Sequence, residues 1–139
     1  MSDYLVEQAH GMHVVRNGPR KAPPLLLIHG SGASGGFWSP VVPALAERHH
    51  VISTDLPGCG QSPPSPPYDV PVQAGRVAAM LDGLGLGPVA AVGHSSGGYV
   101  ATALAEQRPD LVRSHVQVSR IRWQPSARDL SRLAEGETG

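Results

Sequence analysis

The sequence has few of the features that mark secreted, membrane or nucleic-acid-binding proteins. It contains one cysteine, Cys59, so it cannot form an internal disulfide. Eleven basic and eleven acidic side chains give a formal net charge of zero, which offers no attraction to nucleic acid or to an anionic membrane surface. No apolar run is long enough to cross a membrane, and the first residues have neither the basic nor the apolar region of a signal peptide. These absences predict a cytoplasmic protein without nucleic-acid or membrane partners.

The apolar pattern of the chain predicts alternating strands and helices in a single domain. Apolar or alternating runs predict strands at residues 4–9, 12–16, 25–28, 50–54, 89–92 and 111–119. Apolar residues at helical spacing predict helices at residues 37–48, 72–85 and 96–109, whereas residues 63–71 are too rich in proline for regular structure. Because strands and helices alternate after residue 24, we expect an α/β fold, with a mostly parallel sheet and helices on both of its faces.

One stretch, residues 89–100, carries the clearest sign of chemistry. A strand of small apolar residues runs directly into a helix through Gly93-His94-Ser95-Ser96-Gly97, which fits the pattern G-x-S-x-G. Such a turn strains its central residue, and the flanking glycines remove clashes that side chains would make. We expect the Ser95 hydroxyl at the carboxyl edge of the sheet and the Ser96 N–H at a helix N-terminus, where it can stabilise an anion. The alternative is a Gly/Ser-rich turn without chemistry.

Two more loops follow the strands at residues 25–28 and 50–54. The first begins with His29-Gly30-Ser31-Gly32, and the second is Asp55-Leu56-Pro57-Gly58-Cys59-Gly60-Gln61-Ser62. With the turn at Ser95, these motifs have the order and spacing found in the amino-terminal half of α/β-hydrolase-fold proteins. Over residues 4–119, the chain resembles that family, in particular its esterases, lipases and carbon–carbon hydrolases.

The resemblance implies a serine hydrolase that acts on acyl esters or related small molecules and needs no cofactor. Ser95 would be the nucleophile, and the backbone N–H groups of Ser31 and Ser96 would form the oxyanion hole. The family also places a lid, an acid and a histidine after later strands, but the resemblance ends after the sixth strand. We therefore expect a truncated fold with weak or no activity alone. No triad acid or histidine is identified, since His115 lies within a strand and His94 should diverge from Ser95.

Other interpretations remain open. The scaffold could be a non-catalytic binding protein or a fragment. Residues 30–35 also fit G-x-G-x-x-G with Asp55 about 20 residues onward, which is typical of a dinucleotide-binding oxidoreductase, although this leaves the Ser95 turn unexplained. No carboxylate or thiol shares a metal-binding spacing with the histidines, so we expect no metal site. Cys59 has no nearby basic residue to activate it and is expected to be an incidental thiol.

The last part of the chain has a different character. We divide the sequence into a partial hydrolase domain at residues 1–119 and a divergent tail at residues 120–139. In the tail, Ser126 and Asp129 fit a capping box that predicts a short helix, although a frameshift or fragment boundary is an alternative origin of the segment. A sheet that ends at its sixth strand leaves backbone groups unpaired at one edge, so we expect self-association there.

Overall fold

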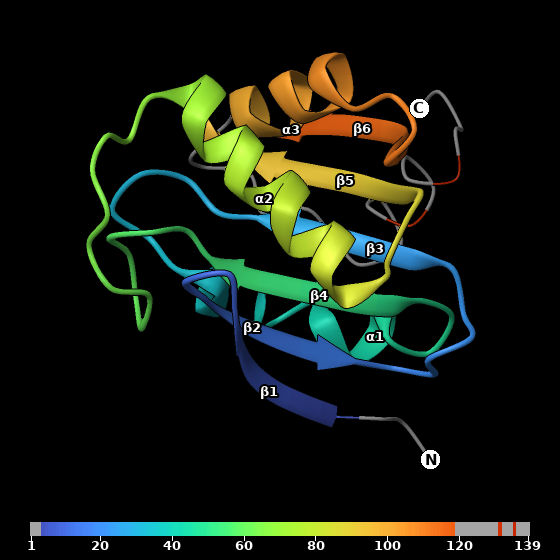
Figure 1. Cartoon of the computed structure of the whole chain (residues 1–139). Helices are drawn as coiled ribbons and strands as arrows, with labels where there is room; N and C mark the ends of the chain where they lie inside the picture. Colours follow the sequence, from blue (N-terminus) through green and yellow to red (C-terminus); the bar gives the residue numbers. More distant parts are fainter. Residues whose placement is uncertain (1–3, 119–130, 132–134, 136–139) are drawn as a thin grey trace.

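The computed structural model describes residues 4–118 together with Ser131 and Glu135. Its centre is a six-stranded sheet in the order β1-β2-β4-β3-β5-β6 (Figure 1). β2 is antiparallel to β1 and β4, and the other neighbouring strands are parallel. The expected α/β fold and all six predicted strands are confirmed. The strands are β1 (Tyr4–Ala9), β2 (Met12–Asn17), β3 (Pro24–Ile28), β4 (His50–Asp55), β5 (Val89–His94) and β6 (Val112–Val118).

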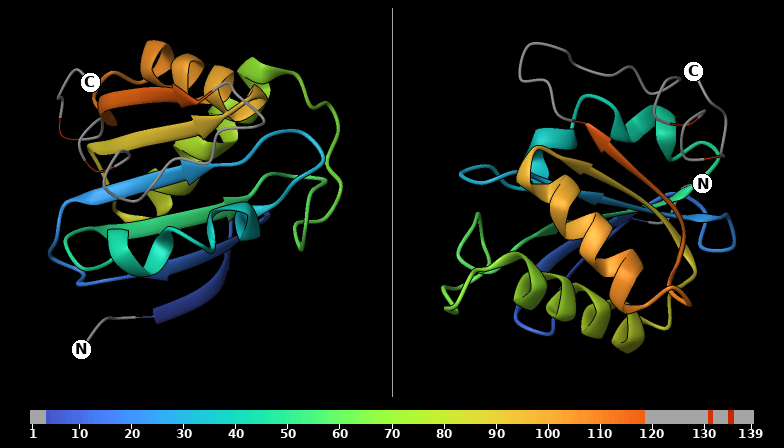
Figure 2. Two further views of the ribbon diagram at one scale, coloured as in Figure 1. Left: turned by 180° about the vertical axis from the view of Figure 1, so that it is seen from behind. Right: turned by 90° about the horizontal axis from the view of Figure 1, so that it is seen from above.

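Helical segments cover both faces of the sheet, as predicted (Figure 2). They are η1 (Gly35–Trp38, a 3₁₀ helix), α1 (Val42–Leu45), α2 (Val70–Leu84) and α3 (Ser96–Gln107). α2 and α3 lie on one face, and η1 and α1 lie on the other. Successive side chains of a strand point to opposite faces, so β3 contributes to two apolar cores. Leu26 and Ile28 belong to the core beneath α2 and α3, whereas Leu25 and Leu27 pack with Trp38 of η1.

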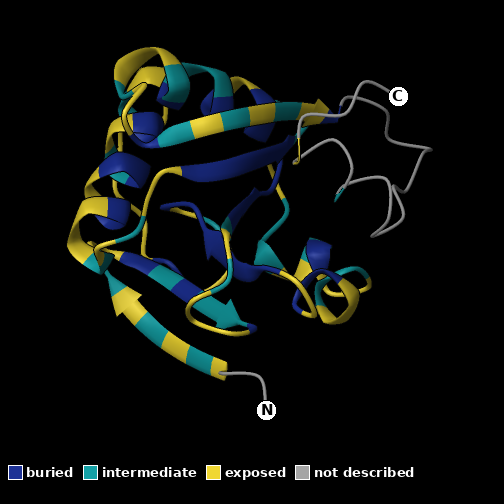
Figure 3. Ribbon diagram, turned by 90° about the vertical axis from the view of Figure 1, so that its right-hand side faces the viewer, coloured by how far each residue is buried: buried dark blue, intermediate teal, exposed yellow. Residues whose placement is uncertain are grey.

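The burial of each strand follows its position in the sheet. The residues of β5, which lies between β3 and β6, are buried from Val89 to Gly93 (Figure 3). β1 alternates between exposed and partly buried positions, and so does β6 up to its last residue, Val118, which is buried. In the part of the chain that the structure describes, β1 and β6 are the two end strands of the sheet. Self-association along β6 stays a prediction.

The prediction of one continuous helix over residues 37–48 is wrong. The segment instead forms the 3₁₀ helix η1 and the single α-helical turn α1, with a turn between them. Pro40 and Pro43 explain the difference, because proline lacks the N–H that a helix interior needs and also restricts the residue before it. The predicted apolar side is nevertheless correct, since Trp38 and Leu45 are buried against the sheet.

α2 begins two residues earlier than predicted. The helix starts at Val70 and takes in Pro71, which was expected to lie in irregular structure. Proline is well tolerated in the first helical turn, where its missing N–H would have no partner within the helix. The predicted end is correct, because Gly85 terminates the helix in the left-handed conformation with φ 68°.

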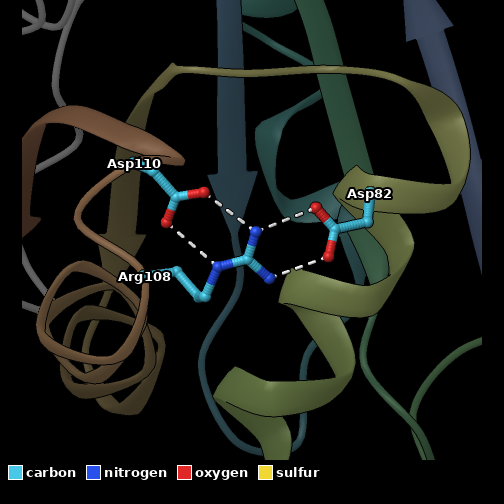
Figure 4. A network of polar contacts seen from close by, with 3 residues as sticks. All are labelled: Asp82, Arg108 and Asp110. Atoms are coloured by element: carbon cyan, nitrogen blue, oxygen red, sulfur yellow. Dashed lines mark hydrogen bonds and ion pairs between the residues drawn. The ribbon is translucent and has the colours of Figure 1, made fainter.

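An ion-pair network on the surface joins α2 to the turn before β6 (Figure 4). Arg108 donates to both carboxylate oxygens of Asp82, at 2.8 and 3.1 Å, and to those of Asp110, at 3.0 and 2.9 Å. Hydrogen bonds from Arg108 lower the pKa of both carboxyl groups. The guanidinium thus holds the C-terminal end of α3 against α2.

The predicted tail helix and the division at residue 119 concern residues that lie almost entirely outside those described. Of the tail, Ser131 and Glu135 are described; the Glu135 N–H donates to the Ser131 carbonyl at 3.0 Å, and the Glu135 carboxylate lies 3.9 Å from His49 Nε2. Within the described residues, no helix is both long and apolar enough to span a membrane.

Candidate active site

Ser95 occupies the sharp turn between β5 and α3. Its backbone has φ 56° and ψ −123°, a conformation that is rare for a residue with a side chain. The Ser95 N–H donates to the Val118 carbonyl at 2.7 Å, and the Ser95 carbonyl accepts the Gly98 N–H at 2.9 Å. The end of β6 and the first turn of α3 therefore hold the strained conformation, and the Ser95 residue remains exposed.

The two glycines of the motif are required by space. A Cβ at Gly93 would overlap the carbonyl oxygen of Gly97. A Cβ at Gly97 would lie 2.5 Å from the Ile28 carbonyl oxygen and still closer to that of His29. The expected crowding is thus real, but at Gly97 the obstacle is the end of β3. The turn at Ser95 is consequently pressed against the loop that begins at His29.

His29 is a structural link between two loops. It is fully buried, its Nε2 accepts the Leu56 N–H at 3.0 Å, and its Nδ1 lies 2.7 Å from the Gly30 carbonyl. Since Nε2 is the acceptor, Nδ1 carries the proton and donates to Gly30. Burial lowers the pKa of His29, which keeps the ring neutral. Both nitrogens are therefore occupied in shaping the loops.

Asp55 holds the same loops together from the end of β4. Its Oδ1 accepts the Gly35 N–H at 2.6 Å, and its Oδ2 accepts the Gln61 N–H at 2.9 Å. The carboxylate is buried and bound by backbone groups of this chain. Asp55 thus serves the geometry of the loops, in contrast to the ribose-binding role that a dinucleotide-binding protein would require.

Ser31 and Ser96, whose N–H groups are the predicted oxyanion donors, lie side by side. The Ser31 N–H donates to the Ser96 hydroxyl at 2.8 Å, and the two hydroxyl oxygens are 2.9 Å apart. Ser96 is the first residue of α3, where N–H groups have no acceptor within the helix. A substrate oxygen that binds the Ser31 N–H must therefore displace the Ser96 hydroxyl.

A cavity of about 310 Å³ opens beside these serines. Ser31 and Ser96 line it, together with the loop from Leu56 to Cys59 and residues of α2 and α3. Ser95 is not one of the lining residues. Gly30 forms part of the wall, however, and a Cβ built on Gly30 would lie 3.2 Å from the Ser95 Cβ. The Ser95 side chain therefore adjoins the cavity wall at Gly30.

None of the described histidines assists Ser95. Within residues 4–118, the Ser95 hydroxyl has no hydrogen bond to a histidine or a carboxylate. His94 instead stacks on Phe37, with ring centroids 4.4 Å apart, and His115 is exposed on β6. The buried pair His49 and His50 has hydrogen bonds to backbone carbonyls of this chain.

Metal and thiol chemistry receive no support from the described residues. Among them, no three His, Cys, Asp or Glu side chains are grouped so as to hold a metal ion. Cys59 lines the cavity, but burial and the nearby Asp55 charge raise the pKa of its thiol, which disfavours the reactive thiolate.

Two features of the site escaped the sequence analysis. The bond between Ser31 and the Ser96 hydroxyl joins residues 65 positions apart, and no local pattern indicates it. Gln73 lines the cavity from α2 and is buried. A signal for Gln73 was present, because it lies four residues before Val77 on the apolar side of a helix, where a polar residue is unusual.

Comparison with known proteins identifies the family. The sequence model of the family described as alpha/beta hydrolase fold matches residues 23–135. The chain belongs to the α/β-hydrolase fold family. It is 41% identical over 105 residues to the lipase LipV of Mycobacterium tuberculosis, covering 76% of this chain and 40% of that protein. It is also 40% identical to the pimeloyl-[acyl-carrier protein] methyl ester esterase of Aeromonas hydrophila, covering 71% of this chain and 38% of that protein.

Solved structures lead to the same family. A membrane phospholipase A described as a bacterial virulence factor has a TM-score of 0.75 and 34% identity, covering 94% of this chain and 45% of that one. The epoxide hydrolase CorEH has a TM-score of 0.76 and 28% identity, covering 97% of this chain and 50% of that one. This chain therefore spans about two fifths of the curated relatives and half or less of these structures. It corresponds to the amino-terminal part of the α/β-hydrolase fold, which sets aside the dinucleotide-binding interpretation.

Proposed function

We propose that this chain carries the nucleophile and the oxyanion-binding groups of a serine hydrolase for small acyl esters. The observation that carries the proposal is the strained, exposed Ser95 at the turn between β5 and α3. Residues held in sparsely populated backbone conformations cluster at functional sites. Family membership supports the reaction class, and the printed names of two relatives, a lipase and a methyl ester esterase, support an ester substrate.

The reaction begins with attack by the Ser95 oxygen on the acyl carbonyl carbon. The C=O π pair moves onto oxygen, and the N–H groups of Ser31 and Ser96 stabilise the resulting oxyanion once the Ser96 hydroxyl has turned away. Collapse of this intermediate expels the alcohol and leaves an acyl-serine, which water then hydrolyses. The proton that Ser95 loses passes to water, since no described side chain is placed to accept it.

This missing acceptor sets the expected rate. Removal of the general base from a serine protease costs on the order of 10⁶-fold in turnover, and about 10³ to 10⁴ over water remains from the oxyanion hole and binding. We expect this chain alone to hydrolyse p-nitrophenyl acetate feebly, because p-nitrophenolate leaves without a proton. Ordinary alkyl esters should not react measurably, because an alkoxide leaving group needs one.

Labelling with a fluorophosphonate tests the nucleophile directly. The wild-type chain and the Ser95→Ala and Ser39→Ala variants are incubated with the probe and followed by intact-mass and peptide mass spectrometry. Ser39 is also an exposed serine, but it lies at the end of η1, away from the cavity. Because no described side chain accepts the Ser95 proton, we expect slow labelling, with one adduct on Ser95 in the wild type and in Ser39→Ala and none in Ser95→Ala.

A non-catalytic binding protein is the second candidate function. It is favoured by the contact of the Ser96 hydroxyl with the Ser31 N–H, which occupies a predicted oxyanion donor. Under this alternative, Ser95 reacts with the fluorophosphonate no faster than Ser39, although circular dichroism shows a folded chain. That result would reject the serine hydrolase.

A further inference from the structure

We infer that the cavity beside Ser31 and Ser96 selects acyl groups that carry a hydrogen-bond acceptor, such as a ketone oxygen, within an otherwise apolar chain, and that Gln73 is the group that recognises it. The inference rests on the proposed function, since it concerns the acyl group delivered to Ser95. Gln73 is 6% exposed and lines the cavity from the first turn of α2. Nearby walls are apolar and come from Leu56, Val70 and Val100.

The orientation of the Gln73 amide follows from its partner. Arg76, one helical turn further along α2, lies with its Nη1 2.8 Å from Gln73 Oε1. Arginine has only donors, so the atom bonded to it must be the amide oxygen. The NH₂ group of Gln73 is consequently the end of the amide that does not contact Arg76. Among the described residues, no acceptor for this NH₂ is found.

The other polar side chains of the cavity are engaged with protein groups, weak donors, or half exposed to solvent. Both ring nitrogens of His29 are hydrogen-bonded to backbone groups. Ser31 and Ser96 bind each other. The Tyr68 hydroxyl accepts the Ser65 N–H and keeps its own O–H donor, but its side chain is half exposed. Cys59 offers only a weak donor. The Gln73 NH₂ is therefore an amide donor on the cavity wall that has no partner among the described residues.

The chemistry of the ligand follows from this donor. A ligand that fills the cavity removes water from this NH₂ group. An N–H group left without an acceptor is then costly, and a ligand oxygen placed opposite it removes the cost. An acyl chain with a methylene at that position would leave the Gln73 NH₂ unpaired, so the site should discriminate against it. A carboxylate would meet the amide without a facing cation, because Arg76 binds the amide oxygen and does not line the cavity. A neutral ketone, ester or ether oxygen fits better.

The kinetic test compares matched esters with the full 139-residue chain. p-Nitrophenyl esters of 4-oxopentanoic, 5-oxohexanoic and 6-oxoheptanoic acid are each compared with the unsubstituted ester of equal length. The three ketone positions sample different depths of the cavity. Release of p-nitrophenolate is measured in the wild type and in Gln73→Glu and Gln73→Met, and the rate of Ser95→Ala is subtracted as background.

The two Gln73 variants remove the donor in different ways. Gln73→Glu keeps the shape and the bond to Arg76 but replaces the NH₂ donor by an acceptor, and Gln73→Met keeps the approximate volume without polar groups. We expect the wild type to prefer one oxo ester by about fivefold, the value of one neutral hydrogen bond. Both variants should lose that preference, so that the oxo ester and the unsubstituted ester of equal length react at the same rate.

A binding measurement separates this inference from the proposed function. Methyl esters of the same acids are titrated into Ser95→Ala, with and without Gln73→Glu, and dissociation constants are measured by NMR. The same Gln73-dependent preference is expected there even if Ser95 proves unreactive. Equal affinity for the oxo and unsubstituted esters in Ser95→Ala, or a preference that survives both Gln73 variants, would overturn the assignment of Gln73. Loss of Ser95-dependent release alone would overturn only the hydrolase.

Discussion

Replacing Gly97 by alanine should destabilise the chain through a single added methyl group. Gly97 lies two residues after Ser95, in the first turn of α3. Its added Cβ would sit 2.5 Å from the Ile28 carbonyl oxygen and closer still to that of His29, whereas ordinary contacts begin at 3.4 Å. Both obstacles are backbone atoms at the end of β3, so no side chain can rotate away.

The expected magnitude comes from two opposing effects. Relief of the contact requires α3 to move from β3 by nearly 1 Å, and overpacking of this kind costs about 1–3 kcal/mol. Alanine gains less than about 1 kcal/mol over glycine near a helix end. We therefore expect the free energy of unfolding to fall by about 1–2 kcal/mol or more, a substantial part of the 5–15 kcal/mol typical of a domain.

Gly75→Ala is the matched control for this substitution. Gly75 is exposed in α2, and its added Cβ would have no neighbour closer than the Gln107 amide oxygen at 3.9 Å. This variant should gain about 0.5–1 kcal/mol from helix propensity alone. Urea denaturation followed by circular dichroism measures all three proteins. If Gly97→Ala is as stable as Gly75→Ala, the close approach of the Ser95 turn to β3 is not a constraint and the steric argument fails.

Two further predictions concern pH. Burial lowers the pKa of His29 below its ordinary value of about 6.5. The contribution of His29 to the free energy of unfolding is therefore complete above about pH 6.5. It decreases as the pH falls toward the folded-state pKa, because only the unfolded chain then binds the proton. Urea unfolding between pH 7.5 and pH 5 should show this loss, and His29→Gln should show a smaller one; an unchanged slope would rule out His29 as its source. Arg108 holds the pKa of Asp82 and Asp110 low, so Arg108→Met should raise both values toward their ordinary range in an NMR carboxyl titration. The free energy of unfolding should then fall more in the wild type than in the variant as the pH decreases below about 4, and this difference should be smaller at high salt. Carboxyl titrations that coincide in the two proteins would contradict a role for Arg108.

Local patterns were sufficient for the order of strands and helices and for the place of Ser95. Four apolar residues at 25–28 predict a buried strand wherever they occur, and a strand that runs directly into a helix through Gly93 to Gly97 constrains the residue at its centre. The same reasoning failed at residues 37–48. There the apolar periodicity correctly selected the buried side chains Trp38 and Leu45, but Pro40 and Pro43 broke the backbone into two short segments.

Contacts between distant segments were decided only by the tertiary structure. The hydrogen bond of the Ser31 N–H to the Ser96 hydroxyl and the closure of the loops by His29 and Asp55 depend on β3, β4 and β5 lying side by side. Gln73 became a candidate recognition group only when α2 packed beside the cavity, because burial and the bond from Arg76 determine which end of its amide remains available. Periodicity reports which face of an element is apolar, whereas the partner of a polar group is set by the relative positions of elements far apart in the chain.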